Sequence, residues 1–401
     1  MALGSKLVCF FIACIATYII VCIGLVLSHA FQRALLYMHW IKFPRSLQCL
    51  EKFHIAQFAR RISCQTADGE TLHGWHLAPT RFGPALAKLH DDEIEREKFF
   101  DHKLADVTEP VIVFMHGQAG GRGLPNRLET CRAMAAQLQA HVLLFDYRGF
   151  GDSTGSPSQS GLLRDAAAMW QWLGARRSAG ALLYGQSLGT AVAAHFAAQL
   201  EDSGGEQAQR LQGLVLDAPF ASIAAAAEVH PWFRIFKCIP QLRDALLNRL
   251  VDKWNSENAV KRVGVPLLIL APAYDSIVGT EGPPRLQLAA SRARTVHCAN
   301  ENTALPEDVF LVKLDGATHF TTHRCNAWLA ALSEFVADVC SRERPHRTNK
   351  FTPRGDEPLL SFKPDAQCTS AQVELATRRI SLCEVRNTSM REDANALDTV
   401  A

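Results

Sequence analysis

Short apolar runs alternate with helical stretches along most of this 401-residue chain, and this alternation constrains the fold more than any other feature. Helical stretches at 128–138, 162–173 and 188–200 lie among the runs VIVFMH, VLLFDY, ALLYG, LVLDAP, LLILA and FLVKL. Strands that are apolar along their whole length, and are joined by helices, are typical of a parallel sheet covered on both faces. With a last helix at 328–339, the pattern predicts an α/β fold.

Two further segments precede this pattern. The runs RRISCQT and TLHGWHL flank residues 67–70, where Asp68-Gly69 is a strong turn signal. We therefore predict an antiparallel hairpin ahead of the parallel strands. Residues 89–106 are rich in charge and indicate an exposed loop or a short helix.

Composition excludes several classes of protein. The net charge of +2 leaves no basic field, so nucleic acid is not an expected partner. The 12 cysteines contain no CxxC pair, which argues against a zinc ribbon or a thioredoxin-type site. His73 and His76 are three residues apart in an expected strand, on opposite faces, and do not suit a metal pair. We expect no metal and no organic cofactor.

The N-terminal region predicts a membrane anchor. Residues 7–27 carry no charge, and as a helix these 21 residues span about 31 Å, which matches a bilayer core of roughly 30 Å. A cleaved signal peptide is the alternative, but its apolar core usually has only about 7 to 15 residues. We predict an uncleaved signal anchor at 1–30 and a juxtamembrane linker at 31–52. That linker is aromatic and basic, which suits either the membrane interface or packing on the domain.

The orientation of this anchor stays open. Lys6 and the amino terminus lie on one side of the apolar run, and the basic residues on the other side are Arg33, Lys42 and Arg45. This charge balance does not decide which side of the membrane the rest of the chain faces.

The pattern GxSxG occurs twice, around Ser153 and around Ser187. A nucleophilic serine of this type needs a buried strand before it and a helix after it, because the tight turn between them exposes the hydroxyl at the edge of the sheet. Ser187 has ALLYG before it and LGTAVAAHFAAQL after it. Ser153 is followed by Gly155-Ser156-Pro157, which does not begin a helix. Ser187 is therefore the predicted nucleophile, and Ser153 is interpreted as a loop residue.

A serine nucleophile needs a histidine base and a carboxylate that orients it, each just past a strand end and in the order Ser, Asp or Glu, His. Asp275 follows LLILAPAY, and His319 follows FLVKLDGAT. Both meet the requirement. The alternatives in the same region are Asp217, Asp315 and His323.

The chemistry also needs two backbone N–H groups to bind an oxyanion. Leu188, directly after the serine, supplies one of them. The favoured second donor is Gln118, in the glycine-bearing loop HGQAGGRG after VIVFM. A phosphate-binding loop is the alternative, but that loop fits neither GxxxxGK[ST] nor GxGxxG.

Two other segments complete the organisation of the chain. A helical lid is expected at about 220–260, between LVLDAP and LLILA, and its stretch 230–240 could line an acyl-chain pocket or touch a bilayer. Residues 341–401 are polar and proline-dotted, and a disordered tail is predicted there. The catalytic domain would then occupy 53–340.

Several blocks in one order resemble a known family. HGQAGGRG, LLFDYRGFGDSTGSPSQSGLLRDA, YGQSLGTAVA, LDAPFASI, DSIV and GATHF resemble the membrane-anchored α/β-hydrolase-domain serine lipases that cleave lysophosphatidylserine and monoacylglycerol. The resemblance covers roughly residues 54–339. It implies an α/β-hydrolase fold with a mostly parallel eight-stranded sheet, helices on both faces and a small lid. It also implies a triad of Ser187, Asp275 and His319, and an active site on the lumenal side of the endoplasmic reticulum.

The expected function is hydrolysis of lipid carboxylic esters, of the lysophospholipid or monoacylglycerol type, through an acyl-enzyme. Two alternatives stay open. The first is an acyl-protein thioesterase, which uses the same residues on a thioester. The second is a hydrolase-fold binding module without catalysis, tethered to a membrane. The sequence identifies no protein partner.

Overall fold

The computed structural model describes residues 6, 9, 10, 12, 13, 17, 21, 24, 28–89, 91–230, 233, 240–301 and 308–342. Most of the expected anchor segment 7–27 lies outside these residues, as do most of the lid stretch 230–240 and the tail from 343 onward. Within the described part of the chain, no helix combines the length and the apolar character needed to cross a membrane.

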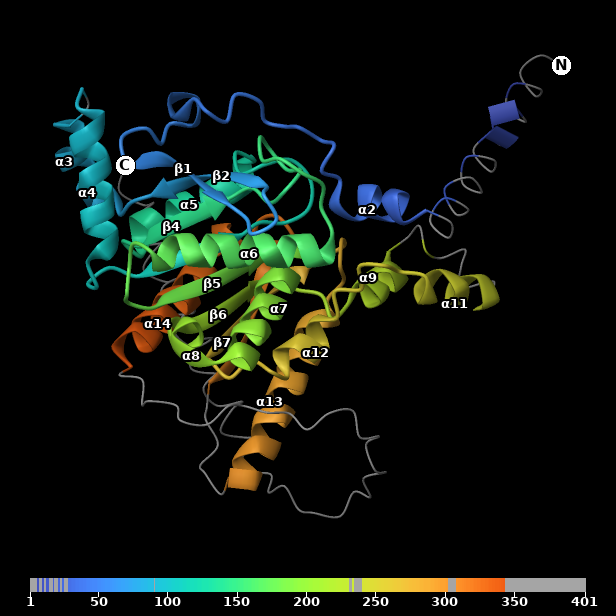
Figure 1. The fold of residues 1–401 in the computed structure, drawn as a ribbon. Helices are drawn as coiled ribbons and strands as arrows, with labels where there is room; N and C mark the ends of the chain where they lie inside the picture. The colour runs from blue at the N-terminus through green and yellow to red at the C-terminus, as the bar shows by residue number, and fades with distance from the viewer. Residues whose placement is uncertain are drawn as a thin grey trace, which may run out of the picture. The chain divides into compact units, whose positions relative to one another are not determined.

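In the described residues, eight strands form one sheet in the order β1-β2-β4-β3-β5-β6-β7-β8 (Figure 1). β2 pairs antiparallel with β1 and β4, and the other neighbours pair in parallel. The predicted hairpin and the predicted mostly parallel sheet are both confirmed. The strands are β1 (Ala59–Gln65), β2 (Thr71–Leu77), β3 (Val111–Met115), β4 (His141–Phe145), β5 (Ala181–Gln186), β6 (Leu211–Asp217), β7 (Leu267–Tyr274) and β8 (Val309–Thr318).

Helices cover both faces of the sheet, as expected. One apolar layer joins α6, α7, α12 and α13 to the sheet, and the other joins α5 and α14 to it. The described helices are α2 (His29–Tyr37), α3 (Gly83–Ala87), α4 (Glu93–Ala105), α5 (Pro125–Gln137), α6 (Gln159–Gly174), α7 (Leu188–Ser203), α8 (Gly205–Gln209), α9 (Ile223–Val229), α11 (Pro240–Asn248), α12 (Ser256–Val260), α13 (Gly282–Glu301) and α14 (Asn326–Ser341), with short 3₁₀ turns η1 (Leu50–Phe53), η2 (Thr80–Phe82) and η4 (Thr322–Arg324).

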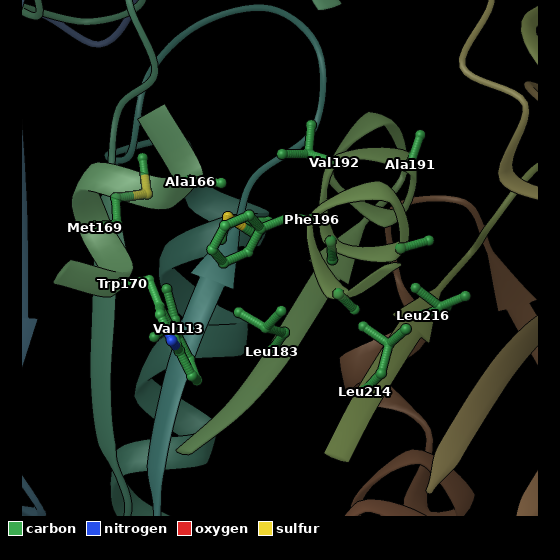
Figure 2. Packing of buried hydrophobic residues seen from close by; sticks show 14 of the residues in the cluster. Val113, Ala166, Met169, Trp170, Leu183, Ala191, Val192, Phe196, Leu214 and Leu216 are labelled. Atoms are coloured by element: carbon green, nitrogen blue, oxygen red, sulfur yellow. The ribbon is translucent and has the colours of Figure 1, made fainter. Parts of the chain in front are cut away.

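Figure 2 shows the layer formed by α6 and α7. Trp170 of α6 and Phe196 of α7 point toward Val113 of β3 and Leu183 of β5, and these four side chains are almost fully buried, as is Met169 of α6. Small residues such as Ala191 along α7 allow this helix to approach the strands closely. Burial of this apolar area fixes where α7 begins. The predicted nucleophile, Ser187, directly precedes that first residue.

The segment 28–52 packs on the domain through its inner face. Tyr37, at the end of α2, is fully buried, donates its hydroxyl to Asp252 Oδ2 at 3.0 Å and accepts from Trp254 Nε1 at 3.1 Å. Its outer face is different, because Trp40 is 61% exposed and Phe43 is 59% exposed. Leu35 is a third exposed apolar residue of this segment, at 40%. Of the two interpretations of the linker, packing on the domain therefore describes the inner face, while large apolar side chains remain exposed on the outer face.

Candidate active site

Ser187 lies between β5 and α7 in a backbone conformation that is rare for a side-chain-bearing residue, with φ 53° and ψ −119°. The turn is tight because both motif glycines lie against neighbouring backbone. A Cβ at Gly185 would lie 2.4 Å from the carbonyl oxygen of Gly189, and a Cβ at Gly189 would lie 1.9 Å from that of Met115. Only glycine fits these positions, and the turn leaves the half-buried Ser187 hydroxyl at the carboxyl end of β5.

Three side chains from three strand ends form a continuous series of hydrogen bonds. His319 Nε2 lies 2.8 Å from Ser187 Oγ, and His319 Nδ1 lies 2.7 Å from Asp275 Oδ2. His319 directly follows β8, and Asp275 directly follows β7. The imidazole can therefore accept the serine proton on one nitrogen while the carboxylate orients the other.

The Asp275 carboxylate is itself fixed by the loop that follows it. Its second oxygen, Oδ1, accepts the backbone N–H groups of Ile277 at 2.9 Å and Val278 at 3.0 Å. The side chains of Asp275 and His319 are 2% and 4% exposed, so this pair is nearly free of competing water. These contacts leave Oδ2 available to the histidine.

The alternative acid and base residues lie elsewhere. Asp315 has an 81% exposed side chain beside Lys313, and His323 Nε2 lies 2.9 Å from Glu129 Oε2. Asp217 is buried at the end of β6 and accepts hydrogen bonds from Tyr184 and Thr322. Burial raises the pKa of Asp217 to about 6. None of these three residues is hydrogen-bonded to Ser187 through its side chain in the described contacts.

The second GxSxG serine has a different environment. Ser153 Oγ donates to the carbonyl oxygen of Asp146 at 2.8 Å and accepts the N–H of His73 at 3.0 Å. The hydroxyl thus connects the loop after β4 to β2. The contacts of Ser153 are those of a loop residue that stabilises local structure.

The loop after β3 lies directly beside the serine. A Cβ at Gly117 would lie 3.2 Å from Ser187 Cβ, so the chain approaching Gln118 passes over the nucleophile. Leu188 is the first residue of α7, and the N–H of a first-turn residue has no partner inside its helix. Both N–H groups singled out as oxyanion donors therefore belong to segments next to Ser187.

Sequence motifs missed the residue that contacts this loop most extensively. Arg127 of α5 is buried and donates hydrogen bonds to four carbonyl groups, those of Gly117, Gln118, Ala119 and Gly121. No motif singles out Arg127. The only signal in the sequence is a lone charge in the first turn of a helix that follows the glycine-bearing loop.

Among the residues that the structure describes, no group of three or more His, Cys, Asp or Glu side chains could bind a metal ion. His76 lies 2.9 Å from His141, ring nitrogen to ring nitrogen, in the buried region beneath α4.

An eight-stranded sheet of this order, with a hydrogen-bonded serine, histidine and aspartate at its strand ends, defines the class of α/β-fold serine hydrolases.

Comparison with known proteins agrees with this class. A family model described as "alpha/beta hydrolase fold" matches residues 110–253. The lysophosphatidylserine lipase ABHD12 of Xenopus tropicalis is 28% identical over 303 residues, which cover 73% of this chain and 74% of that protein. The human protein ABHD12B is 34% identical over 245 residues, which cover 60% of this chain and 63% of that protein. The chain thus spans less than two thirds of the human relative.

Solved structures show the same architecture. The crystal structure of an alpha-beta hydrolase from Vibrio vulnificus superposes with a TM-score of 0.50 at 16% identity, covering 79% of this chain and 92% of that one. At this identity the likeness concerns the fold alone. The matched domain at 110–253 and the relatives at 28% and 34% identity support a similarity to α/β-hydrolase lipases, which are serine ester hydrolases.

Proposed function

We propose that this protein hydrolyses carboxylic esters of lipids, with Ser187 as nucleophile, His319 as general base and acid, and Asp275 as the carboxylate that orients the histidine. The observation that carries this proposal is the series of two hydrogen bonds, 2.8 Å and 2.7 Å, from the elbow serine through His319 to Asp275. Gln118 and Leu188 are the proposed backbone donors to the oxyanion.

The proposed reaction has two halves. Ser187 Oγ attacks the ester carbonyl carbon while its proton moves to His319 Nε2, and the tetrahedral oxyanion is stabilised by the two backbone N–H groups. When this intermediate collapses, the carbon–oxygen bond to the leaving alcohol breaks, and the alcohol takes the proton from His319. Water then attacks the acyl-enzyme while its proton moves to His319. The bond from the acyl carbon to Ser187 Oγ breaks, the serine takes the proton back from His319, and the fatty acid is released. No step requires a metal or an organic cofactor.

A lysophospholipid or a monoacylglycerol is the proposed substrate class. This choice is supported by the name of the Xenopus tropicalis relative and by the motif resemblance described above. Large apolar side chains next to the triad also favour a lipid, because Tyr274 is 69% exposed beside Asp275 and Phe320 is 53% exposed beside His319. Exposed aromatic side chains favour contact with an apolar ligand such as an acyl chain.

The remaining organisation is also proposed here. Residues 1–30 form a signal anchor, 31–52 a juxtamembrane linker, 53–340 the catalytic domain with a lid at about 220–260, and 341–401 a polar tail whose first residue, Ser341, ends α14. The uncharged run 7–27 and the exposed Trp40 and Phe43 support a membrane location. By resemblance, the membrane is that of the endoplasmic reticulum and the catalytic domain is lumenal.

The test is a hydrolysis assay on the full chain in detergent with a lysophospholipid, a monoacylglycerol and a long-chain acyl thioester. Wild type is expected to release fatty acid from at least one oxygen ester, and Ser187→Ala to lose at least about a thousandfold in kcat. Ser153→Ala is the matched control, since it removes the hydroxyl of the other GxSxG motif. Equal activity of Ser187→Ala and wild type would contradict the proposal, and consumption of the thioester alone would transfer it to the thioesterase class.

A further inference from the structure

Arg127 is a buried cation whose partners are backbone carbonyl groups. Its Nη2 atom lies 2.8 Å from the oxygen of Gly117, 2.6 Å from that of Gln118 and 2.8 Å from that of Ala119, and Nη1 lies 2.9 Å from that of Gly121. Burial lowers the pKa of Arg127 to about 10, so the guanidinium remains charged at neutral pH. A buried charge requires such compensation, and here the loop beside the nucleophile supplies it.

These contacts determine the direction of particular N–H groups. A peptide unit is planar and trans, so the C=O of one residue and the N–H of the next point in opposite directions. Because the carbonyl of Gly117 points at Arg127, the N–H of Gln118 points away from Arg127. The next peptide unit follows the same rule, since the carbonyl of Gln118 also points at Arg127 and the N–H of Ala119 donates to Tyr37 O on another segment, at 3.0 Å.

The loop would not hold this shape by local preference alone. Ala119 has a φ of 61°, in the left-handed region, which is strained for a non-glycine residue. The loop that contains Gly117, Gln118 and Ala119 lies next to the nucleophilic serine, because a Cβ at Gly117 would be 3.2 Å from Ser187 Cβ. A rotation of the 117–118 peptide unit would replace an N–H donor with a carbonyl oxygen at the place where negative charge develops.

We infer that Arg127 is a positioning residue for the oxyanion hole, whose guanidinium fixes the 117–118 peptide unit so that the Gln118 N–H faces the tetrahedral intermediate. This inference rests on the proposed function, because it assigns a role within the same site. Arg127 does not touch the substrate. It acts through four carbonyl groups, and a shorter cation cannot reach all of them from the same Cα.

The chain offers a matched control in Arg177. This arginine is also buried and also donates to four backbone carbonyls, those of Leu104 at 3.0 Å, Glu109 at 3.1 Å and Gly180 at 3.4 Å, and that of Asp106. Gly180 precedes β5, so Arg177 lies at the opposite end of that strand from Ser187. Arg127→Lys and Arg177→Lys therefore make the same chemical change at two buried arginines that donate to backbone carbonyl groups. The first arginine lies near the nucleophile, and the second lies far from it.

The experiment measures kcat, KM, inhibition by an alkylboronic acid and thermal unfolding for full-length wild type and both variants. A boronic acid forms a tetrahedral adduct with serine, so its affinity reports on the oxyanion donors. For Arg127→Lys we expect kcat to fall at least about tenfold, part of the 10²–10³ attributed to one oxyanion donor, with KM changed less than about threefold. The boronate inhibition constant should rise in parallel. Arg177→Lys should lower the unfolding temperature and leave kcat and boronate binding within about twofold of wild type.

Two results would overturn the inference. One is an Arg127→Lys protein that is folded and keeps wild-type kcat and boronate affinity; the other is an equal loss of kcat in both variants. If Arg127→Lys does not fold, Arg127→Gln, which buries no charge, is measured in its place against the same criteria. Failure of the proposed function is recognised separately, because wild type itself would then hydrolyse none of the esters, or Ser187→Ala would remain active.

Discussion

Asp217 is the residue that best shows how the surroundings of the triad are built. Its backbone carbonyl accepts the N–H of Ser187 at 2.9 Å, and its Oδ2 atom binds Tyr184 of β5 at 2.6 Å and Thr322 of η4 at 2.9 Å. One buried carboxyl group thus connects the strand of the nucleophile to the loop that follows His319. The sequence alone allowed Asp217 as the catalytic acid; its contacts indicate a structural role instead.

The raised pKa of Asp217 predicts a pH-dependent stability. The folded-state value of about 6 exceeds the ordinary value of 3.8, so the stability from this group is fully present below about pH 3.8 and is lost as pH rises through about 6. The loss is roughly 3 kcal/mol at 1.36 kcal/mol per pKa unit. Asp217→Asn should therefore be more stable, relative to wild type, at pH 7 than at pH 4. Urea unfolding of both proteins at the two pH values measures this, and a difference that is the same at both would contradict the assignment.

Among the elements, the junction between β5 and α7 tolerates the least change. Gly189→Ala would bring a Cβ within 1.9 Å of backbone in β3, which cannot move aside, so we expect a loss of more than about 3 kcal/mol or failure to fold. Gly83→Ala is the control, because Gly83 is also helical and its Cβ would meet nothing within 4 Å. Thermal unfolding should place Gly83→Ala at or slightly above wild type. A Gly189→Ala protein of wild-type stability would show that α7 can shift away from the sheet.

The elements also show what could be predicted from the sequence. The buried strands were identifiable because continuous apolar runs mark a sheet covered on both faces, and α7 because its small and apolar residues follow β5 directly. The sequence pattern does not predict α13. This helix opens with Gly282, Pro283 and Pro284, which are typical of a turn, and few of its apolar residues lie on one face. The charged segment 89–106 forms the 13-residue helix α4, which begins after the capping residue Asp92.

Some residues of the site could be predicted from the sequence and others could not. Ser187, Asp275 and His319 could be named because each lies at the end of a strand with an apolar signature. The contacts of Arg127 and Tyr37 with the loop after β3 could not be predicted. They join different segments of the chain through backbone carbonyl groups, which no side-chain motif encodes.

For the molecule as a whole, the segment after the expected anchor contributes to the active-site loop. Tyr37 O accepts the N–H of Ala119, and Phe43 O accepts that of Gly121 at 3.1 Å. We predict that a chain lacking residues 1–27 keeps its kcat on a water-soluble ester within about twofold, because the two hydrogen bonds to the active-site loop come from Tyr37 and Phe43, which this truncation retains. A chain lacking residues 1–44 should lose at least about tenfold. Steady-state kinetics on both truncations, with circular dichroism to verify folding, decides the matter, and equal kcat values would contradict this coupling.

Labelling with a fluorophosphonate tests the central claim most directly, because this reagent forms a covalent bond with an activated serine. The account predicts that the full-length protein in membranes is labelled, that peptide mapping locates the adduct at Ser187, that Ser187→Ala is not labelled, and that Ser153→Ala is labelled as wild type is. Wild-type protein that is folded but takes no label, or an adduct located at a serine other than Ser187, would contradict it.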